Sequence, residues 1–162
     1  MRYQSKLNMN LYDILEKLDI AYSEVEHAAA YTVNDMKNIT ISIEGIGCKN
    51  LFLKDKKDNF YLYVLPDEQR ANIKEVANVV GVKNLSFANE SDLEKILNLK
   101  PGSVTPFGII NDVENRTLII LDSNLKNNYI LIHPLVNTKT LSIYYDDLIK
   151  FINYLSHQYI CI

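Results

Sequence analysis

Residues 100–112 read KPGSVTPFGIIND, the stretch of this 162-residue chain whose residue types best suit a backbone-built site. Two of the four prolines and two of the five glycines fall inside it. Gly102 and Gly108 permit backbone angles and close approaches that a Cβ blocks, and Pro106 fixes its own φ. Such a loop can point successive N–H groups into a cavity, as anion nests and oxyanion holes do. A plain turn after a helix uses the same residues, and the pattern alone favours that turn.

Two other segments carry polar side chains beside predicted strands. In YILIHPLVNT, His133 ends an apolar strand and Asn137 follows in a turn. In CKNLFLKDKKD, four lysines surround a predicted hairpin turn, and Lys49 and Lys54 belong to its first strand. Because side chains alternate along a strand, Lys49 and Lys54 face opposite sides, and only one of them can face a given site. Taken singly, such residues are more often a half-buried histidine, a turn asparagine and solvent-facing lysines.

Familiar catalytic signatures are absent from the sequence. It has no Walker A loop, no G-x-S-x-G elbow, no G-x-G-x-x-G motif and no H-E-x-x-H motif. The three histidines (His27, His133, His157) and two cysteines (Cys48, Cys161) show no metal-ligand spacing. A Cys48–His133 nucleophile has weak support, because a lone cysteine is more often a small buried residue. We expect neither a metal nor another cofactor.

Composition indicates one folded domain of ordinary size. Hydrophobic residues make up 48% and charged residues 23%, as in globular and unlike disordered chains. No apolar run approaches the roughly 18–20 residues that span a bilayer, and the N-terminus lacks the apolar region of a secretory signal. The net charge of −3 argues against nonspecific coating of nucleic acid, although the hairpin lysines could hold one piece of RNA. We expect a cytoplasmic protein without membrane association.

Hydrophobic periodicity predicts helices and strands that follow one another along the chain. Asn10 is the expected N-cap of the first helix. Ser91, with Glu94 three residues later, predicts a capping box in a later helix, and Pro101 requires that helix to end before it. The order of the elements predicts an α+β fold, a single compact domain whose mixed, largely antiparallel sheet is flanked by helices. The expected helices cover 10–18, 31–39, 72–80, 91–99 and 145–157, and the expected strands cover 22–27, the hairpin 49–66, 85–88, 117–123, 129–134 and 139–145.

Three of these segments occur in the order and spacing of one protein family. They are CKNLFLKDKK, PGSVTPFGIIND and IHPLVNTKTLSI, with SFANESDLEKIL between the first two. The chain resembles the YbaK/ProX-type prolyl-tRNA editing domains, and within them the free-standing alanyl-tRNA(Pro) deacylases. The resemblance covers residues 9–162 and leaves residues 1–8 as an N-terminal tail. It implies an α+β domain that hydrolyses the ester joining a wrong amino acid to tRNA(Pro), and so proofreads for prolyl-tRNA synthetase.

The resemblance assigns roles to the loop. Gly102 and Pro106 match the two ends of the family's Gly-x-x-x-Pro loop. Ser103, Val104 and Thr105 lie between them. The resemblance implies that this backbone holds the aminoacyl carbonyl and the terminal ribose. It also implies that the attacking water is activated with help from the 2′-hydroxyl of the substrate, which fits a sequence that has no obvious general base.

The other two segments acquire roles in the same way. Lys49 matches the family's functional lysine and would contact the 3′-terminal nucleotide, with Lys54 as the alternative. His133 and Asn137 match the HPLVNT segment that helps to shape the amino-acid pocket. Lys139 departs from the pattern, because a small residue is expected after that segment. If its side chain faced inward, the pocket would be narrower.

The expected partner is the aminoacylated 3′ end of tRNA(Pro), with prolyl-tRNA synthetase or an elongation factor as transient partners of a monomer. One alternative is a Cys-tRNA(Pro) deacylase of the same family, which the segment HPLVNTKTL disfavours. The other is a non-catalytic module that binds the tRNA end. The joint presence of Lys49, Gly102, Pro106 and His133 disfavours that module.

The lack of a ligand cluster predicts that no metal takes part in hydrolysis. Dialysis against EDTA should therefore leave the rate of aminoacyl-tRNA hydrolysis unchanged. Activity that disappears with the chelator and returns with zinc would contradict this prediction.

Overall fold

The computed structural model describes residues 10–29 and 43–162. The expected tail 1–8 and the expected helix 31–39 lie outside these residues. Within them, no helix is long and apolar enough to cross a membrane. In chain order the described elements are α2 (Leu11–Lys17), β1 (Ser23–Glu26), β2 (Ile46–Lys54), β3 (Phe60–Pro66), α4 (Ile73–Val80), β4 (Ser86–Phe87), α5 (Glu90–Leu97), the 3₁₀ helix η1 (Pro106–Asn111), β5 (Thr117–Leu121), the 3₁₀ helix η2 (Ser123–Leu125), β6 (Tyr129–Ile132), β7 (Lys139–Tyr144), α6 (Tyr145–Tyr154) and β8 (Tyr159–Cys161).

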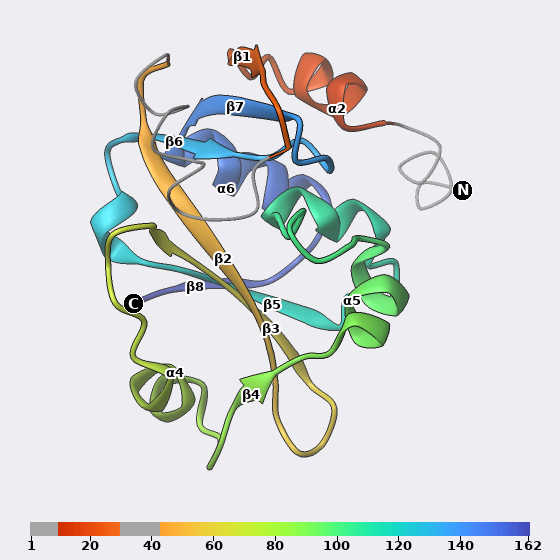
Figure 1. Ribbon diagram of the computed structural model, residues 1–162, viewed down its shortest axis with the longest axis vertical. Coiled ribbons are helices and arrows are strands. Elements are labelled where there is room, and N and C mark those ends of the chain that lie inside the picture. Colours follow the sequence, from red (N-terminus) through yellow and green to blue (C-terminus); the bar gives the residue numbers. More distant parts are fainter. Residues whose placement is uncertain (1–9, 30–42) are drawn as a thin grey trace.

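One mixed sheet connects all of the described strands (Figure 1). Its order is β1-β7-β6-β2-β3-β5-β8, and β4 pairs with β2 beside this path. The pairs β1–β7, β2–β3, β2–β4 and β6–β7 are antiparallel, whereas β2–β6, β3–β5 and β5–β8 are parallel. The predicted fold class, a single α+β domain with a mixed sheet and flanking helices, is confirmed.

Each face of the sheet has its own apolar cluster. Side chains from α2, α5, α6 and η1 pack with one face, and α4 packs on the other. The alternation along β2 follows this division, because Cys48 and Phe52 belong to the larger cluster while Leu51 and Leu53 belong to the α4 cluster. Lys49 and Lys54 therefore lie on opposite faces of the sheet, as the sequence predicted.

Helix caps fix where α2 and α5 begin. Asn10 caps α2 as expected from the sequence. The expected cap of α5 at Ser91 is wrong, because Asn89 occupies that position and forms a capping box with Asp92. The Asn89 side chain accepts from the Asp92 N–H at 2.8 Å, and the Asp92 carboxylate accepts from the Asn89 N–H at 3.2 Å. Asparagine is at least as good a cap as serine, so the helix begins at Glu90 and Ser91 falls inside its first turn.

The C-terminal segment differs from its prediction. The expected helix over 145–157 ends at Tyr154, and Ser156 adopts a left-handed φ of 58°. The chain then forms β8, which pairs in parallel with β5 at the edge of the sheet. A strand of three residues is too short to show a period in the sequence.

His157, in the link from α6 to β8, contacts a buried carboxylate. Its Nε2 lies 3.2 Å from Oδ2 of Asp112, and each side chain is 2% exposed. The same carboxylate accepts the backbone N–H groups of Arg116 at 3.0 Å and Thr117 at 2.8 Å. Burial by itself raises the pKa of Asp112, but the bonds from His157 and the two amides outweigh it, so that the pKa lies below its usual value. The charged aspartate thus ties the segment after η1 to the link before β8.

We predict that Asp112→Asn destabilises the fold at neutral pH by about 1–3 kcal/mol, because it leaves buried hydrogen-bond donors without a carboxylate acceptor. A carboxylate with a lowered pKa stabilises the fold above its unfolded pKa of about 3.9, and this contribution is lost as the pH falls through the folded value. The variant should therefore have a lower Tm at pH 7 and lose less stability under acid. Thermal melts from pH 7 to pH 2 measure both effects. Asp19→Asn, at an exposed turn, is the control. Equal melting of Asp112→Asn and the parent at pH 7 would contradict the prediction.

Candidate active site

Among the described strands, β2 is paired along the whole of one edge but only at the two ends of the other. β3 covers the first edge from Cys48 to Lys54. On the second edge, β6 pairs with Ile46 and Gly47, and β4 pairs with Leu53 and Lys54. Figure 1 shows β6 and β4 at opposite ends of β2. We call the open second edge of residues 48–52 the β2 window.

Asn50 presents both its backbone and an unsatisfied side chain here. The Ala88 N–H donates to the Phe52 carbonyl at 2.9 Å across this edge. Because backbone groups of alternate residues face the same edge, Asn50 also directs its N–H and C=O to the β2 window. Its side-chain Oδ1 is buried without a hydrogen-bond partner among the described residues. The sequence analysis overlooked Asn50, although an amide beside Lys49 within a strand of apolar residues could have indicated it.

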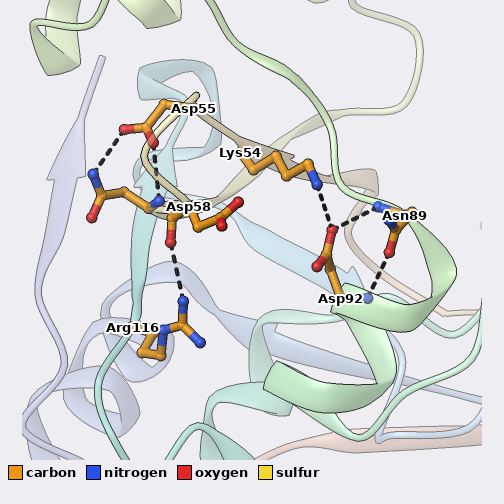
Figure 2. A network of polar contacts seen from close by, with 7 residues as sticks. Lys54, Asp55, Asp58, Asn89, Asp92 and Arg116 are labelled. Carbon is orange, nitrogen blue, oxygen red and sulfur yellow. Dashed lines mark hydrogen bonds and ion pairs between the residues drawn. The ribbon is translucent and has the colours of Figure 1, made fainter.

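The two hairpin lysines have different surroundings. Lys54 forms an ion pair with Asp92 of α5, with 3.0 Å between Nζ and Oδ2 (Figure 2). The bond from Lys54 lowers the pKa of Asp92, and the pKa of Lys54 is raised in return. Lys49 is half-buried on the opposite face of β2, next to Asn50. Lys54 thus joins the hairpin to α5, while Lys49 lies within the β2 window.

The first half of the glycine- and proline-rich loop is a tight turn. The Ser103 N–H donates to the Lys100 carbonyl at 3.0 Å, across Pro101 and Gly102. Gly102 has a φ of 87°. These are the features of a type II turn: proline at the second position, a positive φ at the third, and a hydrogen bond between the first and fourth residues. The positive φ favours glycine at the third position. The turn interpretation therefore holds for Gly102, and the Ser103 N–H is occupied by the turn.

The second half of the loop is attached to the sheet. The buried Thr105 hydroxyl donates to the His133 carbonyl at 2.7 Å and accepts the Phe107 N–H at 3.3 Å. Pro106 begins η1 and has no N–H to offer. The N–H groups of Val104 and Thr105 have no hydrogen-bond partner among the described residues. They are the donors that this loop can supply to an anionic oxygen atom.

His133 comes directly after β6, which pairs in parallel with β2 up to Leu131 and Gly47. The His133 Nδ1 lies 3.0 Å from the Lys139 carbonyl. A carbonyl only accepts, so Nδ1 donates the proton and Nε2 carries the lone pair when the ring is neutral. Burial lowers the pKa of His133, although the bond to Lys139 opposes this shift, and the ring is neutral at pH 7.

A second histidine, which the sequence analysis assigned no role, lies beside the first. The ring centroids of His27 and His133 are 6.3 Å apart. The His27 Nδ1 lies 2.7 Å from the Ala28 carbonyl and must donate to it, so in the neutral ring Nε2 accepts from the Thr140 hydroxyl at 2.8 Å. His27 and Thr140 thus form a hydrogen-bonded pair next to His133.

The remaining predicted residues have simpler positions. Asn137 is half-buried in the turn from β6 to β7, and the described contacts do not connect it with His133 or Lys49. The Lys139 ammonium lies 3.8 Å from the Glu26 carboxylate of β1. Lys139 therefore pairs with the neighbouring strand.

The structure disfavours a thiol nucleophile. Cys48 is 7% exposed, and burial raises the pKa of its thiol far above the usual range, so that it stays protonated at neutral pH. Within residues 10–29 and 43–162, no group of three or more His, Cys, Asp or Glu residues could hold a metal ion.

Residues 27–151 match the family of aminoacyl-tRNA editing domains. The chain belongs to this family. It is 36% identical over 140 residues to the prolyl-tRNA editing protein ProX of Acetoanaerobium sticklandii, which covers 85% of each chain. It is 31% identical over 154 residues to the prolyl-tRNA synthetase associated domain-containing protein 1 of Danio rerio, covering 93% of this chain and 84% of the relative.

The fold agrees with this membership. A crystal structure described as a candidate trans-editing enzyme for prolyl-tRNA synthetase superimposes with a TM-score of 0.69, over 99% of this chain and 93% of the other, at 16% identity. The family resemblance predicted from the sequence is confirmed.

We predict that Thr105→Val destabilises the protein by about 1–3 kcal/mol, because it leaves the buried His133 carbonyl without its donor. Valine keeps the shape of threonine, so that the loss reports the hydrogen bond. Urea denaturation measures it, with Thr138→Val, at an exposed turn position, as the matched control. Unchanged stability of Thr105→Val would show that this bond does not hold the loop.

Proposed function

We propose that this protein is a trans-acting deacylase that hydrolyses mischarged Ala-tRNA(Pro). The proposal is supported by membership of the editing-domain family and by the similarity to ProX. The observation that carries it is the buried hydrogen bond from Thr105 to the His133 carbonyl, which fixes a loop with two N–H groups that have no partner among the described residues at the end of β6, a strand that pairs with β2. The expected partner is the aminoacylated 3′ end of tRNA(Pro), and prolyl-tRNA synthetase is the enzyme whose errors would be corrected.

In this proposal the loop binds the reacting ester. The N–H groups of Val104 and Thr105 stabilise the negative charge that develops on the carbonyl oxygen as water attacks. They lie in a loop that a turn and the Thr105–His133 bond hold in place, so that little reorganisation is needed during the reaction. The 2′-hydroxyl of the terminal ribose helps to activate the water, and the chain supplies position and electrostatics.

The other residues of the window bind the two ends of the substrate. The Lys49 ammonium contacts a phosphate or ribose oxygen of the terminal nucleotide. The Asn50 Oδ1, buried without a partner among the described residues, accepts a hydrogen bond from a substrate N–H or O–H group. The His133 Nε2 is a neutral acceptor and suits the amino group of the alanyl moiety. Each atom is thus matched with a group of opposite polarity on an aminoacyl ester.

The need for such an enzyme follows from the limits of binding selectivity. A pocket that accepts proline gains only about 1–3 kcal/mol for each methylene that a smaller ligand lacks, so prolyl-tRNA synthetase cannot fully exclude alanine by contacts alone. A second site that admits alanine and rejects proline removes the resulting errors.

The proposal predicts the order of substrates. Purified protein should deacylate tRNA(Pro) charged with alanine faster than tRNA(Pro) charged with proline, by about 10- to 200-fold. Single-turnover release of the labelled amino acid measures both rates. The same assay with Cys-tRNA(Pro) tests whether the protein prefers cysteine to alanine. Faster release of cysteine would assign the chain to the other branch of the family. Binding of tRNA without any release would make it a non-catalytic module.

Matched lysine variants locate the site. Lys49→Ala should lose about 10²-fold in rate, because misplacement of the substrate by about 1 Å has costs of that order. Lys54→Ala removes the same charge five residues further along the strand and should keep at least half of the parental rate, since its partner is Asp92. A Lys54→Ala defect as large as that of Lys49→Ala would contradict the assignment.

A further inference from the structure

The largest exposed aromatic surface among the described residues lies at one end of the β2 window. Phe87 of β4 is 64% exposed, more than any other large hydrophobic residue in the described ranges. Phe87 pairs with Leu53 of β2, and the next residue, Ala88, donates to Phe52. Phe87 therefore lies where the open edge of β2 ends. A strand rises about 3.3 Å per residue, so Leu53 is about 13 Å from Lys49 along β2.

The hairpin turn beside Phe87 directs one of its carboxylates inward. Asp55 is 7% exposed and accepts the N–H of Lys57 at 2.8 Å and the Tyr61 hydroxyl at 3.0 Å. It also accepts the N–H and the side-chain amide of Asn59 at 3.0 and 2.9 Å (Figure 2). Burial raises the pKa of Asp55, but these four bonds outweigh it and the pKa is lowered. The acid is used to build the turn.

Cations dominate what the turn exposes. Lys56, Lys57 and Asp58 are exposed. Arg116 adds a third cation beside the turn, since its guanidinium donates to the Asp58 carbonyl at 3.1 Å and lies 5.0 Å from the centre of the Phe60 ring. Figure 2 shows this guanidinium below the turn and the Lys54–Asp92 pair to the right of the turn.

A single exposed ring beside cations suits a nucleobase better than a protein surface. Every base has a π-face, and single-stranded RNA is bound by rings that stack on bases and by cations that contact phosphates. A protein partner buries many apolar side chains together, in an interface of roughly 800 Å² on each side. Phe87 instead pairs with Leu53 near the end of β2, and the charged turn 55–59 follows directly after that strand.

We propose that Phe87 is the stacking platform for an unpaired base upstream of the terminal nucleotide of the RNA substrate, with Lys56 and Lys57 facing its phosphates. The RNA end then lies along the β2 window, with the ester at Lys49 and the chain leaving past β4. This inference rests on the proposed function, because that function supplies an RNA whose 3′ end must reach Lys49.

The sequence provides a direct optical test. The chain contains no tryptophan, so Phe87→Trp introduces a single indole at the platform. Titration with uncharged tRNA(Pro) at low salt should quench its fluorescence, with a midpoint that matches the anisotropy of labelled tRNA. Tyr129→Trp, at an aromatic position that is 43% exposed at the start of β6, is the matched control and should not change. Unchanged Phe87→Trp emission while tRNA binds, or no binding of tRNA to the parent, would overturn the proposal.

Kinetics separate this inference from the proposed function. With Ala-tRNA(Pro), Phe87→Ala should raise KM by about 5- to 100-fold, the range measured for loss of one base stack, with kcat near the parental value. Phe87→Tyr should restore KM. If the parent hydrolyses Ala-tRNA(Pro) and Phe87→Ala keeps the parental KM, the platform is wrong while the function stands. If the parent hydrolyses no aminoacyl-tRNA but the Phe87→Trp signal responds to tRNA, the function is wrong and the platform stands.

Discussion

The site depends on the hydrogen bond from the Thr105 hydroxyl to the His133 carbonyl, 2.7 Å long and wholly buried on the threonine side. It fixes the loop that follows α5 to the end of β6, next to the point where β6 leaves β2. Because the described strands β6 and β4 pair only with the two ends of this edge, the backbone of Asn50 has no strand partner on this side among the described residues. The bond thus brings a loop with free N–H groups to an edge that has polar groups of its own.

Three buried aspartates hold the surrounding turns in place. Asp55 closes the β2–β3 hairpin and Asp112 joins the end of η1 to the segment before β8. Asp122 accepts the Tyr63 hydroxyl and the Gln69 amide, each at 2.7 Å, and the Asn124 N–H at 3.0 Å. A buried carboxylate is tolerated only when donors surround it, so each fixes several groups at once.

The sequence predicted the parts whose cause is local. Alternating β-formers around a lysine-rich turn predicted the hairpin, and Asn10 predicted the start of α2. The opposite faces of Lys49 and Lys54 followed from alternation alone. The cap at Asn89 was missed because Asn89 and Ser91, two positions apart, both suit that role. β8 was missed because these residues form a strand by pairing with β5, which is far away in the sequence.

The site was predicted from three short motifs, and the structure adds what motifs do not contain. Lys49 lies in the β2 window because β6 pairs only up to Gly47 and β4 pairs only from Leu53. Lys54 lies beyond the window and forms an ion pair with Asp92 of α5. The buried oxygen of Asn50, which has no hydrogen-bond partner among the described residues, depends on packing that no motif contains. Gly102 was predicted as either a turn residue or part of a binding loop. Its positive φ shows the turn, and the loop that the turn begins carries the N–H groups of Val104 and Thr105.

The most direct test of this site is Gly102→Ala, studied by thermal melting and by single-turnover hydrolysis of Ala-tRNA(Pro) in parallel. Alanine at a positive φ should cost about 1 kcal/mol or somewhat more of folding stability, which a domain of this size tolerates. The displaced loop N–H groups should cost about 10²–10³ in rate per folded molecule. If folded Gly102→Ala hydrolyses the ester at the parental rate, the loop is only a turn and the site lies elsewhere.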